Sequence, residues 1–225
     1  MEQPAPENDE TSGVEALYPF LFTRQSNLAT VLQEVRRSTE EKAREIMALR
    51  DRLGNELASR LSACAHAMAQ AFRAHAKLFA FGNGGSSTDA QALAQLFLHP
   101  PLGGPLPAFA LTNDVAVVTA LANDVGFDVV FARQIAAFGQ PGDIAVGLST
   151  SGNSANVIRA FDEAAQRGLL TVGLAGYNGG AMAEAASIAH LFVVPSASVH
   201  RIQEVQTTLY HVLWELTQQA LAEGA

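Results

Sequence analysis

Basic side chains are scarce in the second half of this 225-residue chain. Residues 78–225 hold eleven acidic side chains and only four basic ones. The basic ones are Arg133, Arg159, Arg167 and Arg201. Sequence-independent binding to nucleic acid needs a basic surface, which this region lacks. Residues 14–77 are mildly basic, which is typical of a solvated helical face. We therefore expect no nucleic-acid partner.

Cysteine and long apolar runs are also rare. The single cysteine, Cys64, excludes a disulfide within the chain and favours a reducing compartment. Its neighbours at helical spacing are Ala, Leu and Met, which is typical of a small core residue. A membrane-spanning helix needs about 20 consecutive apolar residues, and no apolar run in this sequence is close to that length. The N-terminus also lacks the basic stretch followed by an apolar stretch that is typical of a signal peptide. We therefore expect a cytoplasmic protein without a membrane partner.

The first third of the chain is predicted to be a tail followed by a helical segment. Residues 1–13 are acidic and contain proline, which predicts a disordered tail. Residues 14–76 form the predicted helical segment, which opens with an apolar hook, LYPFLF at 17–22, expected to dock on the domain or on a second subunit. Ser38 and Glu41 have the spacing of a capping box, which predicts a boundary between two helices. The long apolar stripe needs a partner, either the later sheet or the same segment of another subunit.

Residues 77–225 alternate between short apolar strands and helices. The predicted strands cover 78–81, 108–111, 144–148, 169–174 and 191–194. The predicted helices cover 89–98, 115–121, 129–138, 157–165 and 201–221, with a turn at 123–126 and a short helix from 179. Short apolar strands without polar alternation are buried on both faces. The pattern therefore predicts an α/β fold of three layers, a parallel five-stranded sheet with helices on both sides, preceded by long N-terminal helices.

The most informative stretch is GLSTSGNSAN, at residues 147–156. An apolar run precedes it and helical spacing follows it, so it forms a strand-to-helix turn. Such a turn exposes unpaired N–H groups and the positive end of a helix dipole. With the added hydroxyls it is suited to binding phosphate. The alternative is a serine-rich turn in which Ser154 is only a helix N-cap.

A second loop of the same kind, GNGGSST, covers residues 82–88. Both loops follow predicted strands, and ligands of parallel sheets bind at the carboxyl ends of strands near the reversal of strand order. The two loops are therefore expected to face one pocket that binds phosphate without Lys or Arg.

Four motifs together resemble the sugar isomerase (SIS) domain. They are GNGGS (82–86), AND (122–124), STSGNS (149–154) and RIQE (201–204). The subgroup is similar to phosphoheptose isomerases and the related DnaA-initiator-associating proteins. The resemblance implies a flavodoxin-like parallel sheet in a homotetramer with long helices between subunits, and a sugar-phosphate ligand. The implied ligand residues are Asn83, Gly84, Ser86, Asn123, Asp124, Ser149, Thr150, Ser151, Ser154 and Gln203.

The catalytic motif of that subgroup is altered. Phosphoheptose isomerases carry His-Phe-Ala-x-Glu after the first loop, and the Glu moves the proton in aldose–ketose isomerisation. Here the stretch reads ALAQL, with Ala92 at the His position and Leu96 at the Glu position. The resemblance places Gln203 and His211 at the other two zinc-ligand positions, and His211 at the second acid/base position. Two ligands do not complete a zinc site, so we predict no metal and no other cofactor.

Several residues have two interpretations. His211 is either an acid/base residue or a helix histidine packed at a subunit contact. Glu204 is a candidate replacement base, or a surface residue paired locally. His99 and His200 remain open candidates.

Two functions of different classes are therefore open. The first is a non-catalytic SIS module that binds a sugar phosphate and acts as a sensor or as an assembly partner of another protein. The second is an active aldose–ketose isomerase with a rearranged acid/base pair. A dinucleotide-binding domain is a poor alternative, because residues 82–86 lack the spacing of that fingerprint.

Overall fold

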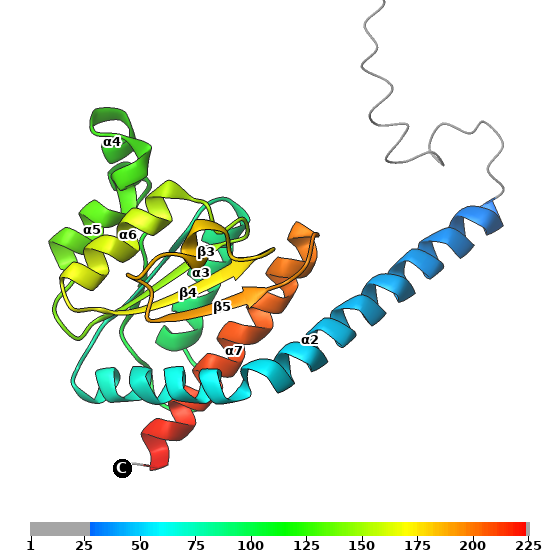
Figure 1. Cartoon of the computed structure of the whole chain (residues 1–225), viewed down its shortest axis with the longest axis horizontal. Helices are drawn as coiled ribbons and strands as arrows, with labels where there is room; N and C mark the ends of the chain where they lie inside the picture. The colour runs from blue at the N-terminus through cyan, green and yellow to red at the C-terminus, as the bar shows by residue number, and fades with distance from the viewer. Residues whose placement is uncertain (1–27, 224–225) are drawn as a thin grey trace, which may run out of the picture. The chain divides into compact units, whose positions relative to one another are not determined.

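The computed structural model describes residues 28–223 (Figure 1). The predicted tail at 1–13 and the hook at 17–22 lie outside the described residues. The chain divides into two compact units, one ending at Met47 and one beginning at Ala48. Each unit is described by itself. No helix within residues 28–223 is long and apolar enough to cross a membrane.

Helix α2 (Leu28–Arg73) is continuous over 46 residues. The predicted boundary at Ser38 and Glu41 is therefore wrong. Glu41 does not turn back to cap a helix but pairs with Arg37 one turn earlier, at 3.9 Å. Arg36 and Glu40 form the same kind of pair at 2.8 Å. These i,i+4 ion pairs support an uninterrupted helix where the capping motif predicted two.

Five parallel strands form one sheet in the order β2-β1-β3-β4-β5. The strands are β1 (Leu78–Gly82), β2 (Ala108–Ala110), β3 (Ile144–Ser149), β4 (Leu170–Gly176) and β5 (His190–Val194). Every residue of β1 and β3 is buried. The predicted parallel sheet with two covered faces is confirmed, and its strand order is that of flavodoxin-like folds.

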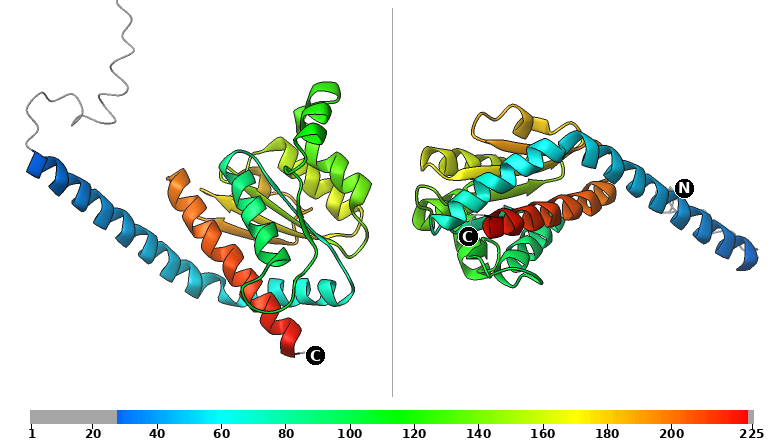
Figure 2. Two further views of the ribbon diagram at one scale, coloured as in Figure 1. Left: turned by 180° about the vertical axis from the view of Figure 1, so that it is seen from behind. Right: turned by 90° about the horizontal axis from the view of Figure 1, so that it is seen from below.

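Helices cover both faces of the sheet (Figure 2). They are α3 (Gly85–Leu98), α4 (Val115–Asp124), η2 (Phe127–Val129), α5 (Val130–Phe138), α6 (Ala155–Gln166), η3 (Gly180–Ala183) and α7 (Val199–Glu223). Leu78 and Ala80 of β1 belong to a core with α3, α7 and the part of α2 after Ala48. Phe79 and Phe81 point to the opposite core, with α5 and α6. The three-layer prediction is confirmed.

The two helix boundaries that differ most from the sequence prediction belong to α3 and α4. Helix α3 begins at Gly85 rather than at residue 89, because Gly84 takes a left-handed φ of 53° and the amide of Thr88 already bonds the Gly84 carbonyl. Helix α4 continues to Asp124, so the turn predicted at 123–126 begins later. The amides of Val125 and Gly126 both bond the Leu121 carbonyl, and the helix ends there. Turn propensity is overridden at both places by local backbone bonds.

Candidate functional site

The order of the strands brings the two predicted loops together. The chain runs from β1 outward to β2, then returns to β3 on the other side of β1. The carboxyl ends of β1 and β3 are therefore neighbours at the point where the strand order reverses. The glycine loop (residues 82–88) leaves one end and the serine loop (residues 149–154) leaves the other. The predicted proximity of the loops is confirmed.

A pair of carboxamides ties the glycine loop to the first turn of α6, directly after the serine loop. The Asn83 side-chain amide donates to Asn156 Oδ1 at 2.8 Å, and the Asn156 amide donates to Asn83 Oδ1 at 2.9 Å. Asn156 is buried at 3% exposure, in the first turn of α6. The sequence prediction gave Asn83 a role as a ligand residue, whereas Asn156 was only part of the predicted strand-to-helix turn. The sequence does hold one indication of this role. Asn156 comes two residues after Ser154, so its side chain can reach back across the turn.

The serine loop is held by its own hydroxyls. Ser149 Oγ lies 2.9 Å from Ser154 Oγ and 3.5 Å from Ser151 Oγ. It also accepts a bond from the Gly152 amide at 3.2 Å, and Ser151 Oγ accepts one from the Asn153 amide at 3.2 Å. Hydroxyl protons rotate to suit their partners, so these oxygens can donate to an incoming anion.

Glycine is required at position 152. Its φ is +68°, and a Cβ there would lie 2.0 Å from the Gly179 carbonyl oxygen. The segment after β4 packs against the loop through two more bonds. The Met182 amide donates to the Gly152 carbonyl at 2.9 Å, and the Ala181 amide donates to Asn153 Oδ1 at 2.8 Å. The backbone of the serine loop is thus fixed without a ligand.

Two helices, α3 and α6, start at this edge of the sheet, and their first turns are alike. No side chain caps α3 or α6. Ser154 occupies the N-cap position of α6, but its hydroxyl bonds Ser149 instead of the helix. The interpretation of Ser154 as only a cap is therefore not supported by its bonds. Ser86, buried at 3% exposure, lies in the first turn of α3. Some first-turn amides already bond backbone carbonyls: Ser86 donates to Asn83, Ser87 to Gly84 and Val157 to Ser154. The remaining first-turn N–H groups and the positive dipole ends of both helices are open to an anion.

Gln203 reaches the glycine loop from α7. A Cβ on Gly85 would lie 2.2 Å from Gln203 Nε2, so the absence of a side chain at residue 85 makes room for the glutamine. Glu204, the next residue, points elsewhere. Its carboxylate is half-exposed and lies 3.4 Å from Arg201. The local-pairing interpretation of Glu204 matches this geometry.

Asn123 and Asp124 lie at the last turn of α4, and both are exposed. The Asn123 amide donates to Asp124 Oδ1 at 2.8 Å. Within residues 28–223, no hydrogen bond joins either residue to the two loops. Thr112, which sequence reasoning missed, does bond the glycine loop, since its hydroxyl lies 2.9 Å from Ser87 Oγ.

His211 lies on α7, two turns after Gln203. Its ring is exposed, and Nδ1 lies 2.8 Å from the Thr207 carbonyl oxygen. The ring stacks on Tyr210, with centroids 4.9 Å apart. A half-buried carboxylate, Asp89, faces the same part of α7. Burial raises the pKa of Asp89, and a hydrogen bond with the Thr207 side chain partly opposes that shift. Burial also raises the pKa of Tyr210, and the charge of Asp89 contributes to that increase.

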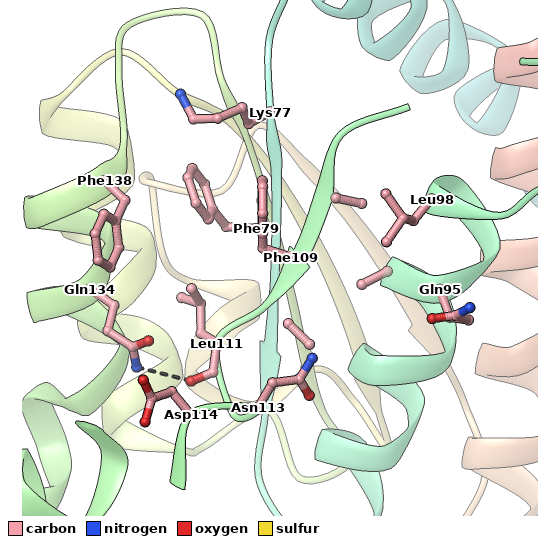
Figure 3. A pocket seen from close by; sticks show the side chains of 13 residues that line it. Lys77, Phe79, Gln95, Leu98, Phe109, Leu111, Asn113, Asp114, Gln134 and Phe138 are labelled. Atoms are coloured by element: carbon pink, nitrogen blue, oxygen red, sulfur yellow. Dashed lines mark hydrogen bonds between the residues drawn. The ribbon is translucent and has the colours of Figure 1, made fainter. Parts of the chain in front are cut away.

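A cavity of about 550 Å³ lies away from these loops, along β2 between α3 and α5 (Figure 3). Three phenylalanines, Phe79, Phe109 and Phe138, line it, and Gln134 donates to the Leu111 carbonyl at its edge. Its lining is mostly apolar, and none of it comes from either loop. We place the anion site at the loops, because phosphate needs the polar donors found there.

The comparisons with known proteins agree with this architecture. A family model described as the SIS domain matches residues 43–176. A phosphoheptose isomerase of Nitratidesulfovibrio vulgaris (Hildenborough) is 44% identical over 194 residues, which is 85% of this chain and 92% of that protein. One from Aquifex aeolicus is 47% identical over 150 residues, covering 65% and 77%. The structure of phosphoheptose isomerase GmhA from Neisseria gonorrhoeae matches with a TM-score of 0.76 and 35% identity, covering 82% of this chain and 99% of that one.

This chain belongs to the SIS-domain family. Within it, the chain is phosphoheptose isomerase-like, as its motifs predicted.

The side chains of this SIS protein do not fit the zinc site that the resemblance implied. Ala92 is exposed and Leu96 is half-buried against the core, and neither carries a donor atom. Gln203 and His211 supply two donors, fewer than the three or four of a protein zinc site. Over residues 28–223 there is no group of three His, Cys, Asp or Glu side chains that could hold a metal. No step of the chemistry is therefore assigned to a metal.

Proposed function

We propose that this SIS protein binds a sugar phosphate at the junction of the glycine and serine loops. The observation that carries the proposal is the pair of uncapped helix N-termini, α3 and α6, tied together by Asn83 and Asn156. Two dipole ends at one place favour a group with more than one negative charge. The names of the relatives, phosphoheptose isomerases, support a phosphorylated sugar as the ligand class.

In this proposal the phosphate is held without a cationic side chain. Neither loop contains Lys or Arg. The hydroxyls of Ser86, Ser149, Thr150, Ser151 and Ser154 and the free first-turn amides donate to the phosphate oxygens. Gly84 lets the backbone approach the ligand closely. Gln203, beside Gly85, and Asn83 then face the sugar, and Asn123 and Asp124 are proposed to do so when the ligand is bound.

The direct test is a double substitution, Ser151→Ala with Ser154→Ala. Each lost bond to a charged group costs about 1.5–3 kcal/mol, so affinity for sedoheptulose 7-phosphate should fall by at least tenfold. Isothermal titration calorimetry measures this affinity. Ser62→Ala, a hydroxyl removed from α2, is the control and should change nothing. Unchanged affinity in the double variant would refute the proposed site.

We further propose that the protein lacks ordinary phosphoheptose isomerase activity. The reaction needs a base close to the carbon that loses the proton, and such a base typically contributes about 10²–10⁴-fold. Leu96 stands where the resemblance places that base, and no zinc site of the family type is proposed. NMR with sedoheptulose 7-phosphate should show no turnover at about 1–10³ s⁻¹, the usual range of enzymes.

Restoring the family pattern tests the reason for this inactivity. Ala92→His with Leu96→Glu should create zinc binding, measured by metal analysis after dialysis, because Gln203 and His211 would then complete four ligands. Leu96→Gln is the matched control, since it adds polarity at the same position without a strong ligand. A double variant that binds no more zinc than this control would contradict the proposed arrangement of the four positions.

An active isomerase is the second candidate, and His211 is the observation that favours it. A carbonyl oxygen only accepts hydrogen bonds, so Nδ1 carries the proton and Nε2 is free in the neutral ring. His211 would then serve as an acid/base residue, with Glu204 required to turn toward the ligand. Turnover by the unmodified protein that is lost in His211→Gln would establish this alternative.

We also propose a homo-oligomer, a tetramer with two-fold axes. Leu28, Leu32 and Val35 of α2 are each more than half exposed in the first unit. Light scattering at micromolar concentration should give four times 23.7 kDa, and the mass of one chain would contradict this. The non-catalytic function also allows a further protein partner, which the mass of the protein alone does not test.

A further inference from the structure

Helices α3 and α7 meet through polar groups that the phosphate site does not use. Asp89 lies one turn after Gly85 on α3, and Thr207 lies one turn after Gln203 on α7. The contact of Gly85 with Gln203 therefore places Asp89 beside Thr207, one turn along both helices, where burial raises the pKa of Asp89 and the Thr207 side chain partly opposes that shift. The Thr207 hydroxyl also reaches the Gln203 carbonyl oxygen at 3.0 Å.

The next turn of α7 carries Tyr210 and His211. Tyr210 is buried at 2% exposure, and its hydroxyl also interacts with the Thr207 side chain. The face of its ring supports His211, with an angle of 27° between the two planes. His211 is therefore fixed by two contacts, the Thr207 carbonyl and the Tyr210 ring. Both residues that make these contacts are themselves tied to Asp89.

Asp89 differs from Asp143, a fully buried carboxylate near the sheet. Asp143 has Lys77 at 2.9 Å and accepts two backbone amides, which is a complete structural ion pair. Asp89 has no ion pair among the described residues. A half-buried carboxylate without a cation is costly, so it is retained where it holds something else in place.

We propose that Asp89, Thr207 and Tyr210 form a positioning cluster that orients His211 toward the bound sugar phosphate. The cluster fixes the ring so that Nδ1 donates to the Thr207 carbonyl and Nε2 is presented to the ligand. This inference rests on the proposed function in one respect only, namely that the ligand is a sugar phosphate. Asp89 and Thr207 are positioning residues, because neither is required to touch the ligand.

The chain offers a matched reference for the His211 ring. His66 on α2 makes the same bond to the carbonyl four residues earlier, Ser62, at 2.8 Å. It is also exposed, and the described structure gives it no stacked ring and no carboxylate cluster. The ¹⁵N signals of His66 and His211 can therefore be compared within one labelled sample.

The test replaces Thr207 by Val, which keeps the shape and removes the hydroxyl. The His211 ¹⁵N signals should move toward a mixture of tautomers, while those of His66 stay unchanged. Affinity for sedoheptulose 7-phosphate should fall about three- to tenfold, the range of one neutral hydrogen bond, and affinity for inorganic phosphate should stay the same. Asp89→Asn should act in the same direction.

Two further variants separate positioning from packing. Thr207→Ser restores the hydroxyl and should restore both the His211 signals and the affinity. Thr208→Val removes a neighbouring hydroxyl, which bonds the Glu204 carbonyl and faces the groove between α2 and α7, and should leave both unchanged. A Thr207→Val variant identical to the unmodified protein in His211 signals and affinity would overturn the inference. If the unmodified protein binds neither ligand, the proposed function fails, and the His211 signals still decide the positioning role.

Discussion

Helix α4 and helix α6 both begin just beyond the carboxyl end of a strand, but they begin in opposite ways. Asp114 caps α4, and its carboxylate accepts the Val117 amide at 3.0 Å. Ser154 stands at the same position of α6 and leaves the amides of the first turn unbonded by any side chain. Helix α3 resembles α6 in this respect.

The difference shows how a fold separates stability from binding. A negatively charged cap satisfies the first turn and complements the dipole, so it stabilises the helix by itself. An uncapped first turn is less stable alone, and an anion from solution can occupy the place of the cap. The chain caps the helix outside the predicted phosphate site and leaves the two helices inside it open.

The largest expected effect comes from making α6 resemble α4. Ser154→Asp would supply the missing cap and place a negative charge where the phosphate binds. A like charge costs several kcal/mol in such a contact, so affinity for sedoheptulose 7-phosphate should fall by more than about a hundredfold. The midpoint of thermal unfolding without ligand should rise. Ser154→Asn, a neutral cap, is the control, and equal losses of affinity in both variants would contradict the role of charge.

A smaller effect is expected when the tie between the two open helices is removed. Asn156→Ala leaves the Asn83 amide without its partner and should lower the free energy of unfolding by about 1–3 kcal/mol. Asn83→Ala should do the same from the other side. Because the two substitutions remove the same bonds, the double variant should lose less than the sum of the singles, with a coupling of about 0.5–3 kcal/mol. Chemical denaturation of the unmodified protein, the two single variants and the double variant measures this coupling. Strictly additive losses would contradict the pairing.

The smallest effect is expected from making α4 resemble α6. Asp114→Ala removes the cap and should lower the free energy of unfolding by about 0.5–2 kcal/mol. Affinity for the sugar phosphate should not change, because Asp114 belongs to neither loop. Asp114→Asn keeps a capping side chain and should recover most of the loss. A clear fall in affinity would mean that α4 contributes to the site through its start as well as its end.

The sheet and the meeting of the loops were predictable because they depend on local pattern. Apolar runs at 78–81 and 144–148 predict buried strands, and the carboxyl ends of neighbouring parallel strands place the glycine and serine loops side by side. The four motifs made the family assignment predictable as well. No comparison or contact tests the roles assigned to His211 and Glu204, which therefore stay predictions.

Contacts between distant side chains were not predictable. The pairing of Asn156 with Asn83 and the position of Asp89 beside Thr207 depend on how whole helices pack, which spacing along the chain does not encode. The continuity of α2 past Ser38 depended on whether Glu41 would pair with Arg37 or turn back as a cap. Both choices satisfy the sequence pattern, and only the folded helix distinguishes them.

The Asn83–Asn156 pair also has a consequence for the order of folding. It joins residues 73 positions apart, so it can form only after β1 and β3 have docked. Closing so long a loop is entropically costly, and such contacts typically form late. A ligand that bridges the two loops binds only the docked form. At a hundredfold excess over its Kd it would stabilise that form by about 2.7 kcal/mol, and the gain should appear mainly as slower unfolding.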